Sequence, residues 1–487
     1  MSNLKISPGA MNNIPPFPDS NNHGSSSTEE SGGINIRIIS KEAIKPASAT
    51  PDHLGIHKLS ILDQLSPHMY ANPLIFFYSN NKQSSRNVDN VIAERREFLR
   101  RSLSEALIQF YPLAGKITDN LHVQCNDDGV YYVEAQVQTS LNKFLENPEN
   151  QLINQLFPYD PSSSELLSET RLMLIQVSFF NCGGFSVGVY ISHKVGDALS
   201  LMTFIKEWAT KAFQHSSNSS SSESGSDQAI HPTFVSPFVF PPDPNLRNDS
   251  YLVAPKLVKE DDYVTRRLVF SSEAIARLKS KAMANNSSSV TAIMGALWKA
   301  YIETSYACLS PIPKNFILTV QVNLRQRNSP PLPVHSFGNI FWMAFAKYQN
   351  SDVLELQSLV NEIKRAIGTI DSGFLQDIKG ENKVAKLMGP LKDLREFCSI
   401  NKVGSFAITS LCKIGVYDAD FGWGKPIWSS VGSRRTNIYG LKNLALLMDT
   451  RSGDGIEALV TLKGEEMAIF EKNMELLTYA SLNPSHL

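Results

Sequence analysis

The sequence FSVGVYISHKVGDALSLMTFIKEWATKAF, residues 185–213, changes its pattern within a short distance. Residues 185–192 form a mostly apolar run that predicts a strand. After residue 197, large apolar residues recur at the spacing of one helix face: Leu201, Phe204, Ile205 and Trp208. The five residues from His193 to Asp197 therefore fall where a strand ends and a helix begins.

The sequence before this stretch also alternates between strand and helix patterns. A second apolar run, residues 172–180, is joined to the first by Asn-Cys-Gly-Gly, which predicts a β-hairpin. Leu99, Leu103 and Leu107 predict an amphipathic helix over residues 91–111 that Pro112 ends. Further strands are expected at residues 34–39, 74–78, 122–125 and 131–135.

The composition changes sharply after residue 214. Ser, Asn and Glu dominate residues 215–226, and Pro-rich sequence follows through Pro244, as is typical of a long flexible linker. Beyond it we expect strands at residues 263–270, 315–322 and 406–417, and helices at 272–284, 290–305 and 353–370. Both halves mix strands with helices, which predicts an α/β protein with two domains of comparable size. The predicted parts are residues 1–33, an extension; 34–214, an N-terminal domain; 215–255, a crossover linker; and 256–487, a C-terminal domain.

The charge of the chain is nearly balanced. It has 46 Lys and Arg against 47 Asp and Glu, for a net charge of -1. Nucleic-acid-binding proteins usually carry a basic excess, so this class is not favoured, and neither is docking on an anionic membrane. No apolar run approaches the length of a transmembrane helix. Residues 1–33 lack the apolar core of a signal peptide and predict a disordered extension.

The five cysteines are scattered and contain no C-x-x-C pair. Such a set disfavours a disulfide scaffold and a thiolate zinc site, and it fits a cytoplasmic protein. The sequence also has no H-E-x-x-H motif and no His-rich cluster, so we expect no metal. The last three residues, Ser485-His486-Leu487, resemble a relaxed peroxisomal address, which leaves that compartment as an alternative.

The five-residue motif His193-Lys-Val-Gly-Asp197 has residue types that suit proton transfer. A histidine at a strand end can project into a cleft, and its titration near neutral pH makes it a natural general base. An aspartate at a helix N-terminus is kept ionised by the backbone N–H groups, so it can orient its neighbours. By itself the pattern is common, and a loop histidine beside a helix-capping aspartate is then the favoured interpretation.

The motif Asp420-Phe421-Gly422-Trp423-Gly424 is far rarer. From average residue usage, this pentapeptide is expected in about one chain in ten thousand of this length. Two glycines flanking a tryptophan indicate a tight turn that packs a bulky ring against nearby backbone. We therefore interpret the motif as structural.

Residues 184–188 match G-x-S-x-G, the nucleophile elbow of α/β-hydrolases. That elbow needs a strand, a sharp turn at the serine and then a helix. Here the apolar run continues past Ser186, so the serine is expected inside a strand and the hydrolase reading is disfavoured.

Together, His193-x-x-x-Asp197 before the midpoint and Asp420–Gly424 near the C-terminus resemble the signature of the plant BAHD acyl-CoA-dependent acyltransferases. The resemblance covers about residues 34–480, and within the family it is strongest to the alkaloid acetyltransferases. Ala198 replaces the glycine that many members have after the motif aspartate. Further similar segments are Ile38–Glu42, Leu62-Asp63-Gln64, Tyr111–Gly115, Cys125–Asp127, Asn323-Leu324-Arg325, Phe337-Gly338-Asn339 and Met448–Arg451.

The resemblance implies two similar-sized mixed-sheet domains, like those of chloramphenicol acetyltransferase, with a crossover loop and an active-site channel between them. It implies that His193 is the general base and that Asp197 is structural, paired with Arg325. It also implies that Asp420–Gly424 is structural, and that an acyl-CoA or substrate is contacted by Gly338, Asn339, Thr409 and Ser410. The co-substrate would be acyl-CoA, most simply acetyl-CoA, with no bound cofactor. The protein would be a monomer that binds neither nucleic acid nor membrane.

Three functions follow from these observations. The first is an O-acyltransferase acting on a small-molecule alcohol of plant specialised metabolism, such as an alkaloid or terpenoid. The second is an N-acyltransferase of the same family acting on an amine, since a neutral histidine serves either acceptor. The third is a non-catalytic relative used in binding, which intact His193 and Asp197 disfavour.

Overall fold

The computed structural model describes residues 34–80, 87–146, 148, 150–158, 171–216, 230–246, 263–282, 288–350, 352–432 and 443–484. Asn35–Leu487 form one compact unit. The expected extension, most of the Ser-rich tract and the C-terminal tripeptide lie outside the described residues.

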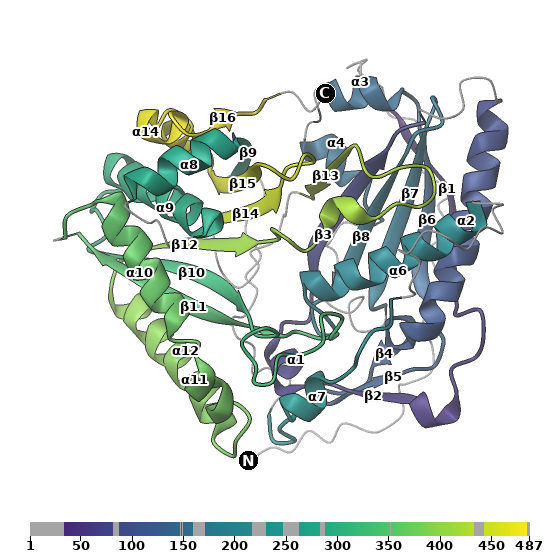
Figure 1. Ribbon diagram of the computed structural model, residues 1–487, viewed down its shortest axis with the longest axis horizontal. Helices are drawn as coiled ribbons and strands as arrows, with labels where there is room; N and C mark the ends of the chain where they lie inside the picture. The colour runs from purple at the N-terminus through teal and green to yellow at the C-terminus, as the bar shows by residue number, and fades with distance from the viewer. Residues whose placement is uncertain are drawn as a thin grey trace, which may run out of the picture. The chain divides into compact units, whose positions relative to one another are not determined.

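A mixed sheet is built mainly from the first half of the chain (Figure 1). Its described strands run in the order β1-β6-β7-β8-β3-β13, and all neighbours are antiparallel except β6 and β7. The expected hairpin is present as β7 and β8, whose residues are all buried. The bounds are β1 Ile36–Ile44, β3 Tyr70–Tyr78, β6 Val130–Val137, β7 Met173–Phe180, β8 Phe185–Ser192 and β13 Trp428–Val431.

Two long helices pack against each other beside this sheet: α2, Val88–Gln109, and α6, Ala198–Ser216. The leucine stripe of α2 and the apolar face of α6 join one hydrophobic cluster with the strands. Trp208 of α6 is fully buried, and its ring N–H donates to the Leu99 carbonyl at 3.0 Å. The helical spacing in the sequence thus predicted both the helices and the faces that they bury.

The first strand is present but is less buried than its alternating pattern predicted. Ile38 and Ile39 are 44% and 42% exposed. β1 forms the edge of its sheet, and its register shifts between Ile38 and Ser40. An edge strand with a bulge has fewer neighbours to cover it, which explains the exposure.

A second mixed sheet belongs to the C-terminal half, with the described strands in the order β11-β10-β12-β14-β15-β9-β16. Strands β10, β12 and β14 are parallel, so their carboxyl ends meet at one edge. The bounds are β9 Tyr263–Phe270, β10 Asn315–Asn323, β11 Phe341–Gln349, β12 Val403–Ser410, β14 Leu444–Asp449, β15 Ile456–Lys463 and β16 Ser481–Leu482. A small third sheet has the order β2-β5-β4, with β2 Ile56–Lys58, β4 Lys116–Ile117 and β5 His122–Gln124.

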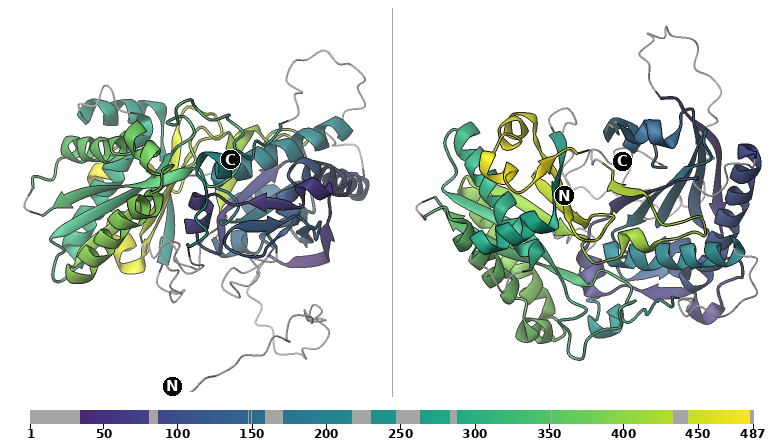
Figure 2. Two further views of the ribbon diagram at one scale, coloured as in Figure 1. Left: turned by 90° about the horizontal axis from the view of Figure 1, so that it is seen from below. Right: turned by 45° about the horizontal axis from the view of Figure 1, so that its top comes forward.

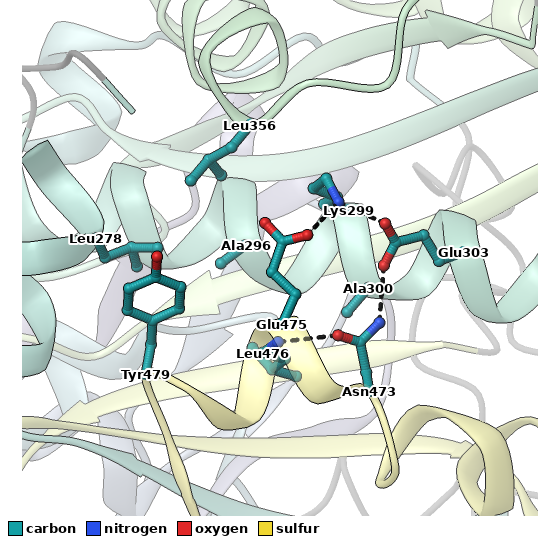
Figure 3. Close-up of a pocket in the computed structure, with 10 residues that line it drawn as sticks. All are labelled: Leu278, Ala296, Lys299, Ala300, Glu303, Leu356, Asn473, Glu475, Leu476 and Tyr479. Atoms are coloured by element: carbon teal, nitrogen blue, oxygen red, sulfur yellow. Dashed lines mark hydrogen bonds and ion pairs between the residues drawn. The ribbon is translucent and has the colours of Figure 1, made fainter. Parts of the chain in front are cut away.

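Helix α9, Ser289–Cys308, is the central helix of the second sheet. It packs against β12 and against helices α8, α10, α13 and α14 (Figures 1 and 2). A charged network ties α14 to it: Lys299 pairs with Glu303 and with Glu475 at 2.6 Å (Figure 3). The other helices are α1 Ile61–Leu65, α3 Leu141–Glu146, α4 Asn150–Asn154, α7 Ser236–Val239, α8 Ser272–Lys281, α10 Leu356–Gly368, α11 Ser372–Asp377, α12 Lys383–Ile400, α13 Gly464–Phe470 and α14 Met474–Leu477.

Two elements differ from the sequence-based expectation in the C-terminal half. The strand expected at residues 406–417 ends at Ser410, and Val416–Asp418 form a short 3₁₀ turn. Lys413 and Gly415 have positive φ angles of 64° and 76°, which are incompatible with a continuing strand. Helix α12 was not predicted, because it contains Pro390 and buries few of its side chains.

The two halves exchange elements. Strand β13 comes from the second half but pairs with β3 in the first sheet. Conversely, Ile61, Leu62 and Leu65 of α1 belong to the hydrophobic cluster of the second sheet. The α/β class is as expected, but the division at residues 215–255 did not anticipate this exchange, because a four-residue strand carries little sequence signal.

Candidate active site

His193 lies immediately after β8 and before α6, as the sequence predicted. The residue is 4% exposed, and its backbone N–H donates to the Met69 carbonyl at 2.7 Å. Strand β3 begins next to Met69 and pairs with β8 through Tyr70 and Ser192. The strand pairing therefore fixes where the histidine leaves the sheet.

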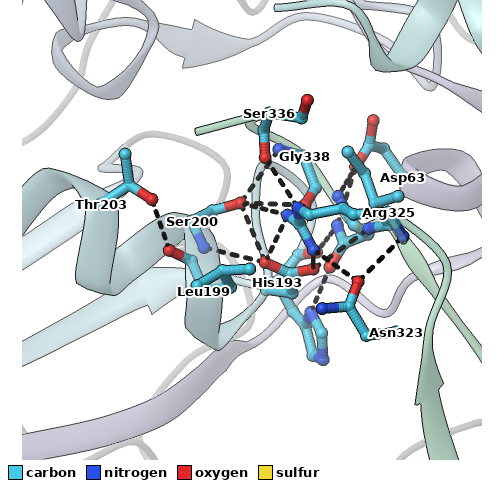
Figure 4. A network of polar contacts seen from close by, with 12 residues as sticks. Asp63, His193, Leu199, Ser200, Thr203, Asn323, Arg325, Ser336 and Gly338 are labelled. Carbon is cyan, nitrogen blue, oxygen red and sulfur yellow. Dashed lines mark hydrogen bonds and ion pairs between the residues drawn. The ribbon is translucent and has the colours of Figure 1, made fainter. Parts of the chain in front are cut away.

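His193 belongs to a network of polar contacts (Figure 4), in which its imidazole is held by an amide from the other half of the chain. Nδ1 of His193 lies 2.9 Å from Oδ1 of Asn339. The amide nitrogen of Asn339 donates to the His193 carbonyl at 2.6 Å and to Oδ1 of Asp63 at 2.9 Å. A ring also stacks on the imidazole, since the centroids of Phe341 and His193 are 5.9 Å apart.

Asp63 is a buried carboxylate that ends this chain of hydrogen bonds. Ser60 caps helix α1 and donates to Oδ2 of Asp63 from its backbone N–H at 2.8 Å and from its hydroxyl at 2.6 Å. The backbone N–H of Asn339 donates to Oδ1 at 2.8 Å. Burial raises the pKa of Asp63, and the hydrogen bonds from Ser60 and Asn339 oppose that rise.

Asp197 and Arg325 form the expected ion pair. The guanidinium donates to both carboxylate oxygens, at 2.8 and 3.0 Å, and Arg325 is 2% exposed. The carboxylate also accepts the backbone N–H of Ser200 at 2.9 Å and of Ile340 at 3.2 Å. Burial raises the pKa of Asp197, but the Arg325 charge and these hydrogen bonds outweigh it, so the pKa is lowered. Asp197 is thus an ionised cap of α6.

The loop around Gly338 joins the two polar clusters. The Ser200 hydroxyl lies 2.9 Å from both Asp197 Oδ1 and the Gly338 carbonyl, and it accepts the Gly338 N–H at 3.0 Å. Gly338 has a φ of +127°, and a Cβ there would lie 3.0 Å from the Cβ of Ser236. Only glycine suits this conformation, and the next residue is then presented to His193.

Thr409 and Ser410 lie at the carboxyl end of β12, on the edge where β10 also ends. The Thr409 hydroxyl donates to the Gln321 side chain at 3.0 Å, and Ser410 accepts the Cys412 N–H at 3.2 Å. Substrates of open α/β sheets usually bind at the carboxyl ends of strands. The expected contact of Thr409 and Ser410 with acyl-CoA or substrate stays a prediction.

The Asp420–Gly424 motif packs onto the N-terminal half. Oδ1 of Asp420 accepts the N–H groups of Gly422 and Gly424 at 2.8 and 2.9 Å, which closes a tight turn. Phe421 is fully buried in the cluster of the first sheet. The Arg95 guanidinium lies 5.2 Å from the Trp423 ring centroid. These contacts are those of a packing motif.

Ser186 lies inside β8, opposite Ser178 of β7 and Phe77 of β3. The strand continues through Ser192, so no strand–turn–helix elbow is present around this serine. In the described part of the chain no group of three His, Cys, Asp or Glu could hold a metal ion. None of the described helices is long and apolar enough to span a bilayer.

No role was predicted from the sequence for three polar residues of the site: Asp63, Ser200 and Lys194. Asp63 could have been noticed, because Ser60-x-x-Asp63 has the spacing of a capping box. Ser200 follows Asp197 by three residues, the usual target of an N-cap. Lys194 is fully buried, and its ammonium donates to the Gln64 carbonyl and to Oδ1 of Asn120, both at 2.7 Å. No pattern in the sequence indicated those partners.

The model of the Transferase family matches residues 34–477. The chain belongs to this family, the BAHD acyltransferases, and is an acyl-transferring enzyme. The chain is 35% identical to epi-neemfruitin B 7-O-acetyltransferase of Melia azedarach over 92% of its length and 99% of the relative's. It is 34% identical to stemmadenine O-acetyltransferase of Catharanthus roseus over 90% of its length and 96% of the relative's.

Solved structures support the fold. The crystal structure of vinorine synthase is 33% identical and superposes with a TM-score of 0.76, covering 92% of this chain and 99% of that one. Fusarium sporotrichioides TRI101, complexed with coenzyme A and T-2, has a TM-score of 0.64 at 15% identity, covering 88% and 99%. The second likeness concerns the fold alone. The expected family and fold class are confirmed.

Proposed function

We propose that the protein transfers an acyl group, preferably acetyl, from acyl-CoA to a hydroxyl of a small plant metabolite such as an alkaloid or terpenoid. The relatives support this acceptor class, because they are O-acetyltransferases of limonoids and of alkaloids such as stemmadenine and salutaridinol. Acyl-CoA is the donor that fits the family, and the acetyltransferases among the relatives agree with acetyl-CoA.

One observation carries the proposal: a buried histidine at a strand end has its Nδ1 bound to an amide oxygen from the opposite half of the molecule. In the proposed mechanism, Nε2 of His193 removes the proton from the acceptor hydroxyl. The oxygen attacks the thioester carbonyl, and the tetrahedral intermediate collapses and breaks the C–S bond. The CoA thiolate leaves and takes the proton from the imidazolium, so the products are the ester and CoA thiol.

Asp197 and Arg325 act as structural partners in this proposal. The Asp197 carboxylate accepts five hydrogen bonds, two from Arg325, two from Ser200 and one from Ile340, and they tie the start of α6 to the loop before β11. The pair thereby holds the start of α6, which follows His193, against the loop that carries Asn339. We further propose that the protein is a monomer and that it is cytoplasmic; the scattered cysteines of the sequence support the second of these proposals.

The experiment that tests this function measures CoA thiol release from acetyl-CoA with a panel of alcohols and amines. The parent should be active with alcohols, and His193→Gln should lose about 10² to 10⁴ in turnover at an unchanged melting temperature. His215→Gln, at the far end of α6, is the matched control and should keep full activity. Near-normal turnover of His193→Gln would overturn the mechanism, and activity with amines alone would establish N-acylation instead.

A further inference from the structure

We propose that Asn339, oriented by the carboxylate of Asp63, fixes the proton of neutral His193 on Nδ1 and so makes Nε2 the nitrogen that receives the acceptor's proton. The inference rests on the proposed function of His193 and assigns its reactive nitrogen. Asn339 and Asp63 are positioning residues in this role.

The first step is the orientation of the Asn339 amide. One end of this amide lies 2.6 Å from the His193 carbonyl and 2.9 Å from Oδ1 of Asp63. A backbone carbonyl only accepts hydrogen bonds, and so does an ionised carboxylate. That end must therefore be the NH₂ group. The opposite orientation would place an amide oxygen against two acceptors in a buried site, where unmatched polar groups are strongly unfavourable.

The second step follows from the first. If the NH₂ group faces Asp63, the amide oxygen faces His193, and it lies 2.9 Å from Nδ1. An amide oxygen cannot donate, so Nδ1 must carry the hydrogen. A neutral imidazole has only one N–H, and its lone pair is then on Nε2. The tautomer of His193 is set by a residue 146 positions away in the chain.

The third step concerns what holds Asp63. Its carboxylate receives four hydrogen bonds, two from Ser60 and two from Asn339. The Lys194 ammonium also donates to the backbone carbonyl of Asp63 at 3.4 Å, which helps to hold this residue in place. Helix α1 is itself anchored by its apolar residues in the hydrophobic cluster of the second sheet. The Asp63 carboxylate is thus held in one position, from which it orients the Asn339 amide.

The arrangement also suits the charged form of the histidine. When Nε2 takes the proton, the ring becomes a cation, and the Nδ1–H then donates a charge-assisted hydrogen bond to the Asn339 oxygen. The amide need not move in this step, so the site is prepared for the developing charge. Without the amide, the neutral ring would divide between two tautomers, of which only one has its lone pair on Nε2.

The first test is spectroscopic and needs no activity. Full-length protein labelled with [¹⁵N]histidine is studied by long-range ¹H–¹⁵N correlation, which distinguishes the two neutral tautomers, and His193→Gln identifies the His193 signals. We expect the Nδ1–H tautomer in the parent and a mixture of tautomers in Asn339→Ala. An Nε2–H tautomer in the parent would overturn the inference, even if Asn339→Ala does not fold.

The second test is kinetic. Asn339→Ala should lower kcat about 10- to 100-fold, within the range of general-base catalysis, with little change of KM for acetyl-CoA. Asp63→Asn, which keeps the shape but removes the charge, should lower kcat less. The control is Glu207→Gln on α6, an equally buried acid that accepts the Ile230 N–H, and it should leave kcat and the His193 signals unchanged. Unaltered kcat and tautomer in Asn339→Ala would contradict the inference.

Different results would contradict the general-base role of His193 and the positioning role of Asn339. If His193→Gln keeps its turnover, the proposed function of His193 is wrong, whatever the tautomer. If His193→Gln is inactive but the parent shows the Nε2–H tautomer, the general base stands and the role of Asn339 is wrong.

Discussion

At the scale of single residues, the site contains two buried carboxylates in opposite environments. Asp63 is surrounded by neutral donors, and burial raises its pKa. Asp197 faces a guanidinium, and despite its burial its pKa is lowered. Folding therefore favours the ionised form of Asp197 and disfavours that of Asp63. The stability of the protein should depend on pH through both groups, with opposite signs.

Asp197 should stabilise the folded protein near neutral pH and lose this effect in acid. Its folded pKa is lowered, so the contribution is complete above the unfolded value of about 3.9 and is lost as the pH falls through the folded pKa. Asp197→Asn should therefore melt well below the parent at pH 6, and the difference should narrow below about pH 4. Asp393→Asn on the exposed face of α12 is the control and should melt like the parent throughout. A difference that grows towards low pH would show the opposite sign of the pKa shift.

The pair itself can be tested by a double-mutant cycle. Removing one partner of a buried ion pair leaves the other charge unmatched, at a cost of about 3–5 kcal/mol. Asp197→Ala and Arg325→Ala should each lower the free energy of unfolding by roughly this amount, and the double variant should lose less than the sum. Denaturant unfolding and turnover are measured on the same samples. If Asp197→Ala is inactive but as stable as the parent, Asp197 acts in the chemistry and its structural role is wrong.

At the scale of elements, the sequence predicted strongly periodic segments well. The strand of residues 263–270 and the hairpin strand of residues 185–192 have the predicted bounds. The second is fully buried, as its mostly apolar sequence predicts, whereas the first has a mixed sequence and is mostly half-buried. The observed ends of the helices differ from the predicted ones by a few residues.

The candidate site was predicted only in part. His193, Asp197 and Arg325 lie in recognisable motifs, whereas the contact of Asp63 with Asn339 spans 276 positions and leaves no local pattern.

The Asp420–Gly424 motif should matter for stability rather than for the chemical step. Phe421 is fully buried, and its ring centroid lies 5.0 Å from that of Trp208. Phe421→Ala should lower the free energy of unfolding by about 3–5 kcal/mol, through lost contacts and the cavity that remains. The same substitution at Phe238, which is 78% exposed, should change it by less than about 1 kcal/mol. Normal stability with lost turnover in Phe421→Ala would assign the motif to the chemistry.

At the scale of the whole molecule, the exchange of α1 and β13 joins the two halves. Each hydrophobic cluster contains side chains from both halves of the chain: the second has Ile61 of α1, and the first has Phe421. The proposed catalytic histidine and its amide partner also come from different halves. The composition of the sequence could show that there were two halves, but not that they share their cores.

Limited proteolysis tests this arrangement. The Ser-rich tract of residues 215–226 has too few apolar residues to offset its ordering entropy, so we expect the first cuts there and in residues 1–33. The two large fragments should stay together in gel filtration, because their cores interpenetrate, and should keep acyltransferase activity. Fragments that separate without denaturant would contradict the exchange. A first cut inside either half would contradict the expected boundary.

The place of β13 also bears on how the protein is made. Strand β3 can be completed only by β13, which the ribosome adds about 350 residues later, roughly 20 to 70 s at usual elongation rates. During that interval the edge of β3 has unpaired backbone groups, which is the feature that invites association with other chains. The first half therefore cannot complete its sheet until about residue 431 has been synthesised, and a shorter nascent chain would be a natural client for a chaperone that shields an open sheet edge.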